Sequence, residues 1–340
     1  MKIAIIGAGW YGLYCALLLQ DKHDITIYEK NNDIFTGASY YNQNRLHLGY
    51  HYPKSYKTRM MCLKGYEKFI KLFSNVIEEC PKNLYVISKE SIIDYNTFLQ
   101  IYNTTDYEHT INKNTFLKNI EGDLINTKEK IINSKKAKLF FKENLKNVKI
   151  IYNTNIFSIE QHDKVILNNT FEYDFCFNCS YNQLNLNEEK CEYEKTISLI
   201  YKRIKKINDY DAITIMDGGF SSIFPRDLKN NTYTLTNVIY TPFYKNKNFK
   251  KVEEKKLTIE ELEHIKINMV KDITKYLTTF DKEFEYDGYF ESFKCKTINN
   301  NDGRECIITK NKNVVNVHCG KIIGIFEFED YLKKLNIFYK

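Results

Sequence analysis

The chain has 340 residues, a net charge of +7 and 15% aromatic residues, but only 13 Gly and 4 Pro. This length suits about two domains, and the apolar content excludes collagen-like, low-complexity and intrinsically disordered proteins. Because the positive charge is spread along the chain and accompanies no nucleic-acid-binding module, we expect no nucleic-acid partner.

The cysteines and the N-terminus indicate a reducing compartment. Nine cysteines are scattered without disulfide-framework or metal-ligand spacing, so we expect neither disulfides nor a bound metal. Cys176 and Cys179 form a C-x-x-C, but no second pair accompanies them and their run is typical of a buried strand. The chain starts with an apolar strand rather than a signal peptide, and no apolar run approaches the roughly 20 residues of a membrane-spanning helix. We therefore predict a cytoplasmic protein without a membrane span.

The first thirty residues predict a strand, a Gly-rich turn, a helix and a second strand. Gly7, Gly9 and Gly12 form a G-x-G-x-x-G directly after the apolar run 2–6, and Glu29 ends the second strand. In such a unit the first Gly permits the tight turn, the second leaves space for a pyrophosphate, and the third lets the helix pack on the strand. The helix N-terminus attracts phosphates, and the carboxylate accepts ribose hydroxyls. The segment therefore predicts a dinucleotide site.

After Lys30 the regular alternation typical of a nicotinamide dehydrogenase stops. An irregular stretch, 31–56, precedes a helix predicted over 57–73. The stretch contains a run of residues in a recognisable order: Ala38, Ser39, Asn42, His47, Gly49, Tyr52 and, after a one-residue gap, Ser55 and Lys57.

This run resembles the pattern A-S-x-x-N-S-G-x-x-H-x-G-x-x-Y-x-P-x-S-L-K-A of FAD-dependent oxidoreductases of the D-amino-acid oxidase type. The nearest branch is that of the L-2-hydroxyglutarate oxidases. Two residues depart from the pattern, since Asn44 stands where the family has Gly and Arg45 takes an apolar position. These departures imply a pocket with a different lining.

Later segments resemble the same family. The helix predicted over 135–146 and the strand over 147–156 resemble the part that lies over the adenine, and 173–180 resembles the returning strand, with Ser180 in place of a Gly. Residues 314–322 and the helix 324–335 resemble the closing strand and helix, whose N-terminus points at the flavin pyrimidine in the family. The resemblance implies an α/β fold with a Rossmann-like FAD-binding domain at 1–65, 130–180 and 312–340. A mostly antiparallel β substrate domain (α+β) would occupy 66–129 and 181–311.

The resemblance also implies which residues bind FAD. They are Gly7, Ala8, Gly9, Trp10, Tyr11, Gly12, Glu29, Lys30, Ala38, Ser39, Asn44, Leu46, His47, Ile156, Cys179, Ser180, Gly320, Lys321 and Ile322. For His47 three hypotheses remain open: a contact with the flavin ring, a covalent tether at the flavin C8 methyl group, and a packed core histidine.

The expected substrate contacts lie in the flavin-adjacent stretch and among the arginines. A guanidinium fork is suited to a carboxylate or phosphate, and arginines are scarce beside the lysines of this chain. The family's C-terminal carboxylate-binding Arg has no clear counterpart, which puts a simple amino-acid or 2-hydroxy-acid substrate in question. The predicted catalytic and substrate residues are Arg45, His47, His51, Tyr52, Arg226 and Arg304.

The middle of the chain predicts the substrate domain. Strands are expected at 197–202, 213–216, 233–238 and 290–295, and residues 217–226 predict a hairpin followed by an edge strand that Pro225 closes. Thr258 and Glu261 form a capping box for a helix over 257–276. A second insertion, about 66–130, is expected to cap the pocket.

These features predict an FAD-dependent oxidase or dehydrogenase that acts on CH–NH or CH–OH donors. It would transfer a hydride from a C–H beside an amine or hydroxyl of a small polar, anionic substrate to flavin N5, with O2 or another electron acceptor completing the cycle. Two alternatives remain, a flavin-dependent isomerase resembling the nucleotide-sugar mutases and a non-catalytic dinucleotide-binding protein. The sequence leaves the substrate, the acceptor and the oligomeric state open.

Overall fold

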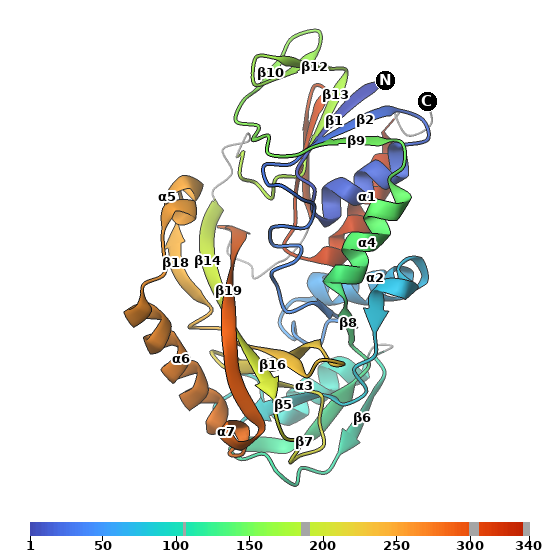
Figure 1. Cartoon of the computed structure of the whole chain (residues 1–340). Helices are drawn as coiled ribbons and strands as arrows, with labels where there is room; N and C mark the ends of the chain where they lie inside the picture. Colours follow the sequence, from blue (N-terminus) through green and yellow to red (C-terminus); the bar gives the residue numbers. More distant parts are fainter. Residues whose placement is uncertain (105–106, 185–190, 299–305, 336–340) are drawn as a thin grey trace.

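The computed structural model describes residues 1–104, 107–184, 191–298 and 306–335. Two large sheets dominate the molecule, one built around the N-terminal strand and one built from the middle of the chain (Figure 1). Across these described ranges, no helix has both the length and the apolar character needed to cross a bilayer.

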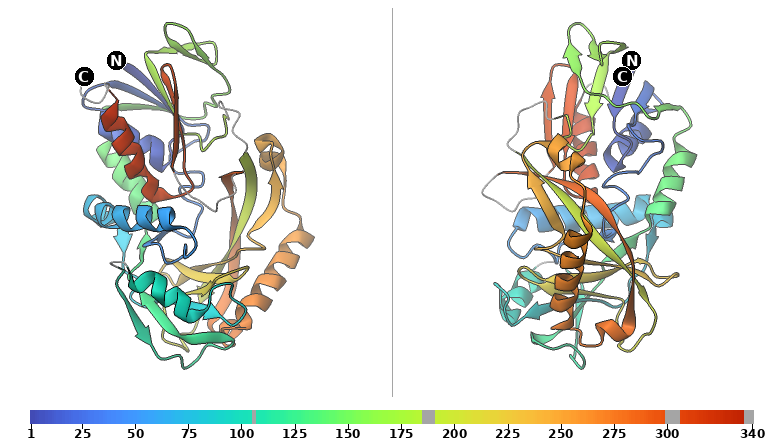
Figure 2. Two further views of the ribbon diagram at one scale, coloured as in Figure 1. Left: turned by 180° about the vertical axis from the view of Figure 1, so that it is seen from behind. Right: turned by 60° about the vertical axis from the view of Figure 1, so that its left-hand side comes forward.

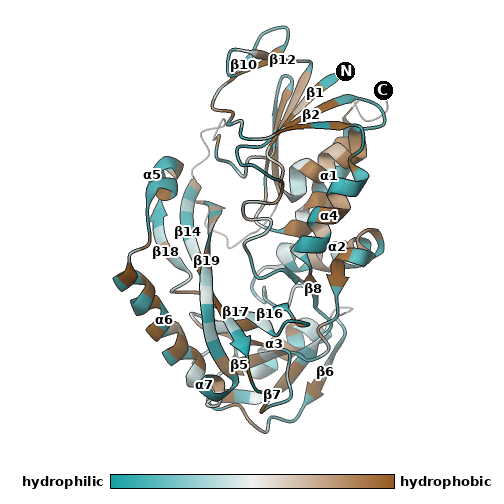
Figure 3. Ribbon diagram, viewed as in Figure 1, coloured by the Kyte–Doolittle hydropathy of each residue, from teal (hydrophilic) through white to brown (hydrophobic). Residues whose placement is uncertain are grey.

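A six-stranded sheet forms around the N-terminus. Neighbouring strands of this sheet run parallel, except for the antiparallel pair β20–β21. The strands β1 and β2 are apolar and almost wholly buried (Figure 3), as expected of a parallel sheet that is covered on both faces. The strand order is β20 (Ile307–Asn311), β21 (Val314–His318), β13 (Phe175–Asn178), β1 (Lys2–Ile6), β2 (Asp24–Tyr28) and β9 (Val148–Ile151).

Helices cover one face of this sheet and a small meander covers the other. On the helical face, α1 (Trp10–Leu19) lies between α4 (Ser134–Asn144) and α8 (Ile325–Lys334) (Figure 1). The meander consists of β10 (Ile159–Gln161), β11 (Val165–Leu167) and β12 (Phe171–Tyr173). Its buried Val165 and Leu167 pack with Ala4 and Ile6 of β1. This is the Rossmann-like α/β arrangement that the sequence predicts, although the meander itself is not among the predicted elements.

The second sheet has nine strands and is mostly antiparallel, as predicted, with β5–β15 as a parallel pair. Its longest strands, β14 and β19, run side by side as a twisted ribbon (Figure 2). The strand order is β18 (Pro242–Asn246), β14 (Cys191–Arg203), β17 (Thr232–Asn237), β16 (Ser221–Asp227), β15 (Ala212–Met216), β5 (Asn83–Ser88), β7 (Ile120–Thr127) and β6 (His109–Asn112), while β19 (Phe284–Thr297) pairs with β14.

Helix α6 (Ile259–Thr274) packs on this sheet through Ile265, Met269 and Ile273, which share one face of the helix. The predicted capping box is confirmed, because Thr258 Oγ1 accepts from the Glu261 amide while the Glu261 carboxylate accepts from the Thr258 amide. The shorter helices near this sheet are α3 (Tyr95–Asn103), α5 (Phe249–Glu254) and α7 (Phe280–Glu283).

A small three-stranded sheet lies between the two large ones. It consists of β3 (Arg45–Leu46), β8 (Lys130–Ile132) and β4 (Ile77–Glu78). The predicted helix at 57–73 is α2 (Tyr56–Leu72), which is followed by η1 (Ser74–Val76) and contacts η2 (Ile322–Gly324) near the C-terminus. The small sheet therefore joins residues 45–46 to residues 77–78 and 130–132.

Two expectations about the middle of the chain are wrong. The strand that contains Pro225 is not at an edge, since β16 pairs with β15 and β17, and a register irregularity after Pro225 accommodates its missing N–H. The segment 66–130 shares a sheet with the middle of the chain, because β5, β6 and β7 extend the nine-stranded sheet, and its role as a cap over the pocket stays a prediction. Residues 307–311 belong with the nucleotide sheet rather than the substrate domain, because β20 pairs with β21. The other domain boundaries stay a prediction.

Candidate functional site

The candidate site lies where the parallel strands of the first sheet end. Gly7 follows β1, Glu29 follows β2, Cys179 follows β13 and Cys319 follows β21. In open α/β sheets ligands bind outside these carboxyl ends. The four segments that the sequence assigned to a dinucleotide therefore meet at the edge where such a ligand would bind.

Each of the three glycines of the loop lies so close to another atom of the protein that a Cβ would not fit. A Cβ on Gly7, whose φ is +96°, would lie 2.8 Å from the Cys179 carbonyl oxygen. A Cβ on Gly9 would lie 2.7 Å from Ser39 Oγ, and one on Gly12 would lie 2.0 Å from the Gly7 carbonyl oxygen. The loop is thus folded tightly enough to present backbone rather than side chains to a pyrophosphate.

The N-terminus of α1 presents backbone N–H groups at this loop. Gly9 is the N-cap and makes no side-chain capping bond, while the Trp10 amide donates to Ser39 Oγ at 3.0 Å. The Trp10 ring itself is buried among Phe35, Phe69 and other aromatic rings. Trp10 therefore serves the site through its backbone, and the helix end offers partial positive charge to phosphates.

Glu29, which the sequence predicts to bind a ribose, is held in place by two backbone amides. Its side chain is buried, and its Oε2 accepts from the Ala8 amide at 2.9 Å while its Oε1 accepts from the Asn31 amide at 3.0 Å. Each carboxylate oxygen retains a second lone pair for a hydroxyl. The free lone pairs of Glu29 and the backbone N–H groups of the Gly-rich loop together fit the adenosine diphosphate half of FAD.

The closing loop after β21 is tied to α1. The Tyr11 hydroxyl donates to the Lys321 carbonyl oxygen at 2.7 Å. A Cβ on Gly324 would lie 2.3 Å from Tyr11 Oη and 2.5 Å from Cys319 Sγ, so only glycine allows this approach. The first and last parts of the chain thus jointly form the rim of the predicted flavin site.

Asn44 shows why the family pattern tolerates a departure at this position. Its φ is +59°, in the left-handed region that Gly adopts freely and Asn adopts more readily than other residues. Its side-chain oxygen accepts from Ser134 Oγ at 2.7 Å, and its carbonyl oxygen accepts from the Ile132 amide. Asn44 therefore adopts a backbone conformation that is open to glycine as well, and it fixes the loop to the start of α4.

The other predicted FAD residues lie near these contacts. Lys30 forms an ion pair with Glu253 of α5, with Nζ 2.7 Å from Oε1. The Ser180 amide donates to Asn178 Oδ1 at 3.2 Å, so the residue in place of the family Gly is held by its own turn. Leu46 and Ile156 are buried, whereas Ala38, Gly320 and Ile322 are partly or fully exposed.

A buried charge cluster lies beside the predicted flavin segment and has Glu129 at its centre. Glu129 has no exposed surface. Its carboxylate accepts from the Leu48 amide at 2.8 Å and from the Tyr85 hydroxyl at 2.7 Å. The Arg45 Nη1 and His47 Nδ1 atoms each lie 3.6 Å from a carboxylate oxygen. Burial alone would raise the pKa of Glu129, but His47, Arg45 and the Tyr85 hydroxyl lower it to about 2.

Arg45 does not present an open fork, contrary to the expectation that it binds a substrate anion. Its Nη1 donates to Tyr85 Oη at 2.8 Å and to Thr214 Oγ1 at 2.7 Å, and its Nη2 donates to Ser222 Oγ at 3.0 Å. The guanidinium carbon lies 4.1 Å from the centre of the Phe224 ring. The side chain is 1% exposed, and both Nη atoms donate within the protein, while the buried Nε has no hydrogen-bond partner in the described structure.

His47, His51 and Tyr52 do come together with Lys321, which the sequence assigned to FAD. The His47 ring centre lies 5.5 Å from that of His51 and 5.7 Å from that of Tyr52, and Lys321 Nζ lies 4.4 Å from the centre of the Tyr52 ring. Burial, with a contribution from Lys321, lowers the pKa of His47 to about 4. Burial, together with the charge of Arg45, lowers the pKa of Lys321 to about 7. Near neutral pH, the imidazole is therefore uncharged and the amine exists in both forms.

The remaining predicted arginines have other places. Arg226 donates from Nη1 to the Asn42 carbonyl oxygen and from Nη2 to the Tyr40 carbonyl oxygen, each at 3.1 Å, so it ties β16 to the flavin-adjacent loop. These bonds to carbonyl groups do not favour the predicted role in anion recognition. Arg304 lies outside the described residues, and its predicted role stays a prediction.

The chemistry-bearing residues that sequence reasoning missed are Glu129 and Tyr85. Glu129 lies in the run Lys128-Glu129-Lys130, which is typical of a solvated turn, and Tyr85 lies in an ordinary apolar strand. Neither position carries a local signal, because the burial of Glu129 depends on the small sheet that joins β8 to β3.

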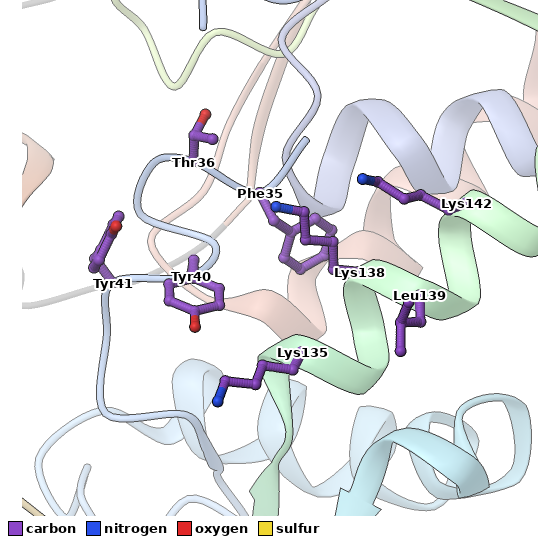
Figure 4. Close-up of a pocket in the computed structure, with 8 residues that line it drawn as sticks. All are labelled: Phe35, Thr36, Tyr40, Tyr41, Lys135, Lys138, Leu139 and Lys142. Carbon is purple, nitrogen blue, oxygen red and sulfur yellow. The ribbon is translucent and has the colours of Figure 1, made fainter. Parts of the chain in front are cut away.

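Two cavities lie to one side of this cluster. The larger, of about 480 Å³, lies between α4 and the loop after β2 (Figure 4), and Lys135, Lys138 and Lys142 line it. The smaller, of about 160 Å³, is lined by Asn44 and Arg226 among others. Neither cavity is lined by Glu129, so they are separate from the charge cluster.

The Gly-rich cradle, the buried Glu29 carboxylate at the end of β2 and the closing loop are features of a dinucleotide-binding α/β protein. The family described as FAD dependent oxidoreductase matches residues 2–182, which is more than half of the chain. The chain belongs to this family, of the D-amino-acid oxidase type, and is an FAD-dependent oxidoreductase. The narrower resemblance to the L-2-hydroxyglutarate oxidases stays a prediction.

Relatives with known names support the same class. The chain is 27% identical to the FAD-dependent monooxygenase FPY4 of Fusarium mangiferae, over 96% of this chain and 88% of the relative. It is 22% identical to the FAD-dependent monooxygenase kojA of Aspergillus flavus, over 96% of this chain and 83% of the relative. Both alignments extend through the substrate sheet as well as the nucleotide-binding part.

Solved structures show the fold at lower identity. Glycine oxidase from Geobacillus kaustophilus superposes with a TM-score of 0.75 at 11% identity, over 95% of this chain and 90% of that one. L-alpha-glycerophosphate oxidase from Mycoplasma pneumoniae, with FAD bound, has a TM-score of 0.73 at 14% identity, over 95% and 91%. The two-sheet architecture is therefore shared across nearly the whole chain.

Proposed function

We propose that this enzyme oxidises a small polar, anionic molecule by removing a hydride from a C–H bond beside an amine or hydroxyl. Bound FAD would supply the chemistry by accepting that hydride at N5. The observation that supports this proposal is the composition of the buried cluster: Arg45, Glu129, His47 and Lys321 surround the stretch expected along the flavin.

The charge of the cluster favours an anionic substrate. Arg45 and Glu129 balance each other, and His47 is neutral near pH 7, which leaves the Lys321 ammonium without a counter-charge in the cluster. The lowered pKa of Lys321 reflects the free-energy cost of that charge. A substrate carboxylate or phosphate beside Lys321 would supply the missing negative charge and favour the ammonium form.

His47 is suited to accept a proton from the amine or hydroxyl that is oxidised. Because its pKa is lowered to about 4, the imidazole keeps its lone pair at neutral pH. Glu129 lies 3.6 Å from His47 Nδ1 and would stabilise the imidazolium that forms. Arg45 acts on this pair as a positioning residue, since it balances and orients the Glu129 carboxylate.

The test is a screen of amines, hydroxy acids and sugar derivatives for anaerobic bleaching of the flavin. We expect bleaching without added reductant, and we expect Lys321→Met to raise KM strongly for the anionic substrate but little for its neutral ester. The loss should be about 1.5–3 kcal/mol, typical of a hydrogen bond to a charged group. The matched variant Lys310→Met removes a lysine of β20 instead and should leave KM unchanged.

The same screen separates the alternatives. Two relatives carry the name monooxygenase, and a requirement for NADH or NADPH before any bleaching would favour that chemistry over direct oxidation. Interconversion of a sugar derivative by prereduced enzyme, without net bleaching, would favour the isomerase hypothesis. An equal effect of Lys321→Met on the anionic substrate and on its ester would contradict the assignment of the anion to Lys321.

A further inference from the structure

We propose that Cys191, Cys295 and His318 form a binding site for a zinc ion between the two large sheets. The three side chains are buried, and each offers one ligand atom to a set whose members all lie within 4.8 Å of one another. None of the three belongs to the residues assigned above to FAD or to the substrate. The sequence predicted no metal, because these residues are far apart along the chain and have no ligand spacing.

The fold brings the three residues together from three strands. Cys191 begins β14 and Cys295 lies near the end of β19, its antiparallel neighbour. His318 ends β21 of the other sheet. A metal held by all three would therefore join the nucleotide-binding sheet to the substrate sheet.

The hydrogen bonding of His318 is that of a metal ligand. Its Nε2 lies 3.2 Å from the Cys295 carbonyl oxygen. A carbonyl only accepts, so Nε2 carries the proton and the lone pair is on Nδ1, which is buried and has no hydrogen-bond partner in the described structure. A ligating histidine characteristically donates its other ring N–H to a backbone carbonyl in this way.

A side-chain donor lies beside the two sulfurs. The Asn182 side-chain amide donates to Cys191 Sγ at 3.1 Å and lies 3.7 Å from Cys295 Sγ. Hydrogen bonds of this kind stabilise metal-bound sulfur from outside the ligand set. Two thiolates and one neutral imidazole neutralise a divalent ion and suit Zn²⁺, which binds Cys and His at about 2.3 and 2.0–2.1 Å.

The geometry requires a modest contraction. Those bond lengths place the ligand atoms of a tetrahedral centre about 3.5–3.8 Å apart, so the three side chains would move together by about 1 Å or less. A water molecule would supply the fourth ligand. A disulfide is the less favoured use of the two cysteines, because Cys191 pairs with Thr297 and Cys295 pairs with Tyr193, which sets the cysteines on a diagonal rather than opposite each other.

The experiment measures zinc in the FAD-loaded enzyme after dialysis against a zinc salt and a phosphine reductant. We expect about one zinc ion per chain in the wild type and a loss of affinity of more than about 100-fold in Cys295→Ser and His318→Gln, which exceeds the effect of an outer-shell change. The control is Cys176→Ala, which removes a buried thiol of β13 and should keep the zinc.

A second measurement uses thermal unfolding. Zinc should raise the Tm of the wild type and a chelator should reverse the rise, because the ion binds only the folded state. Neither reagent should shift the Tm of His318→Gln. If the wild type and His318→Gln hold equal amounts of zinc, or neither holds any, the proposal is overturned. A Cys191–Cys295 disulfide in protein purified without reductant would also overturn it.

Discussion

Glu129 carries its charge with no exposed surface, beside the Arg45 guanidinium and the neutral His47 imidazole. A buried carboxylate is costly to desolvate, and in this structure the cost is offset by Arg45, Tyr85 and the Leu48 amide together. The same contacts hold the His47 side chain near its expected place. The residue that sequence reasoning did not find is thus the one on which the orientation of the others depends.

The variant Glu129→Gln should destabilise the protein by about 3–5 kcal/mol, because it leaves the Arg45 charge buried without its counter-charge. The free energy of unfolding from denaturant titration measures this loss. Glu79→Gln is the control: Glu79 forms an exposed ion pair with Lys130, so its loss should cost no more than about 1 kcal/mol. Equal costs for the two variants would show that the cluster does not stabilise the fold.

A second prediction at the residue scale follows from the left-handed backbone conformation of Asn44. Asn44→Ala should lose about 1–2 kcal/mol more stability than Asn44→Gly, although both lose the bond to Ser134, because only Ala adds strain at a φ of +59°. Denaturant titration of the pair isolates the backbone effect. Ala and Gly variants of equal stability would contradict it.

At the scale of the elements, the Gly-rich turn and α1 make a prediction about the cofactor. Gly9→Val should abolish stoichiometric FAD binding, because its Cβ would lie 2.7 Å from Ser39 Oγ and its methyl groups would enter the pyrophosphate space. The flavin absorbance of the purified protein measures the occupancy, and the released flavin should be FAD rather than FMN. The control is Gly37→Val, in the stretch between β2 and β3, where an added Cβ meets no atom within 4 Å. Full occupancy in the Gly9 variant would argue against the loop assignment.

The capping box of α6 gives a smaller effect. Thr258→Ala should cost about 1 kcal/mol of stability, since the Glu261 amide loses its acceptor at the helix start. Urea denaturation measures this cost. Thr278→Ala, at an exposed position after the same helix, serves as the comparison and should change stability little. A neutral Thr258 variant would mean that packing of the helix, rather than its cap, sets its stability.

Elements of this protein were predictable where their signals are local. The apolar run of β1, the glycines after it and the capping box of α6 each act within a few residues, and the structure confirms them. The position of β16 was not predictable, because Pro225 argues for an edge and only the pairing with β15 and β17 shows otherwise. The cluster of Arg45 with Glu129 was missed for the same reason, since it depends on strand pairing between distant segments.

At the scale of the whole molecule, the lowered pKa values predict how stability depends on pH. His47 titrates near pH 4 in the folded state against an ordinary value of about 6.5, so between these values the unfolded chain binds more protons and stability falls as the pH falls. Glu129, whose pKa is about 2 in the folded state, adds a loss in the same direction below about pH 4.5.

We therefore expect the free energy of unfolding to fall by up to about 3 kcal/mol between pH 6.5 and pH 4 from His47 alone. Denaturant titrations across this range measure the slope. His47→Gln should flatten the slope above pH 4.5 and leave the steeper loss below it, because Glu129 is still present. A wild-type curve that is level between pH 6.5 and 4.5 would contradict the buried, neutral state of the imidazole.

The tie between Tyr11 and the loop at Lys321 has a consequence for how a cell makes this protein. The ribosome releases the Gly-rich turn about 300 residues before β21, which pairs with β13, and α8, which packs on α1. Until then β13 has an open edge, and the rim of the cofactor site lacks one side. Capture of the flavin therefore has to wait until β21 and α8 have left the ribosome, and a chain that is cut short near residue 300 would keep the whole Gly-rich turn yet never complete the predicted binding site.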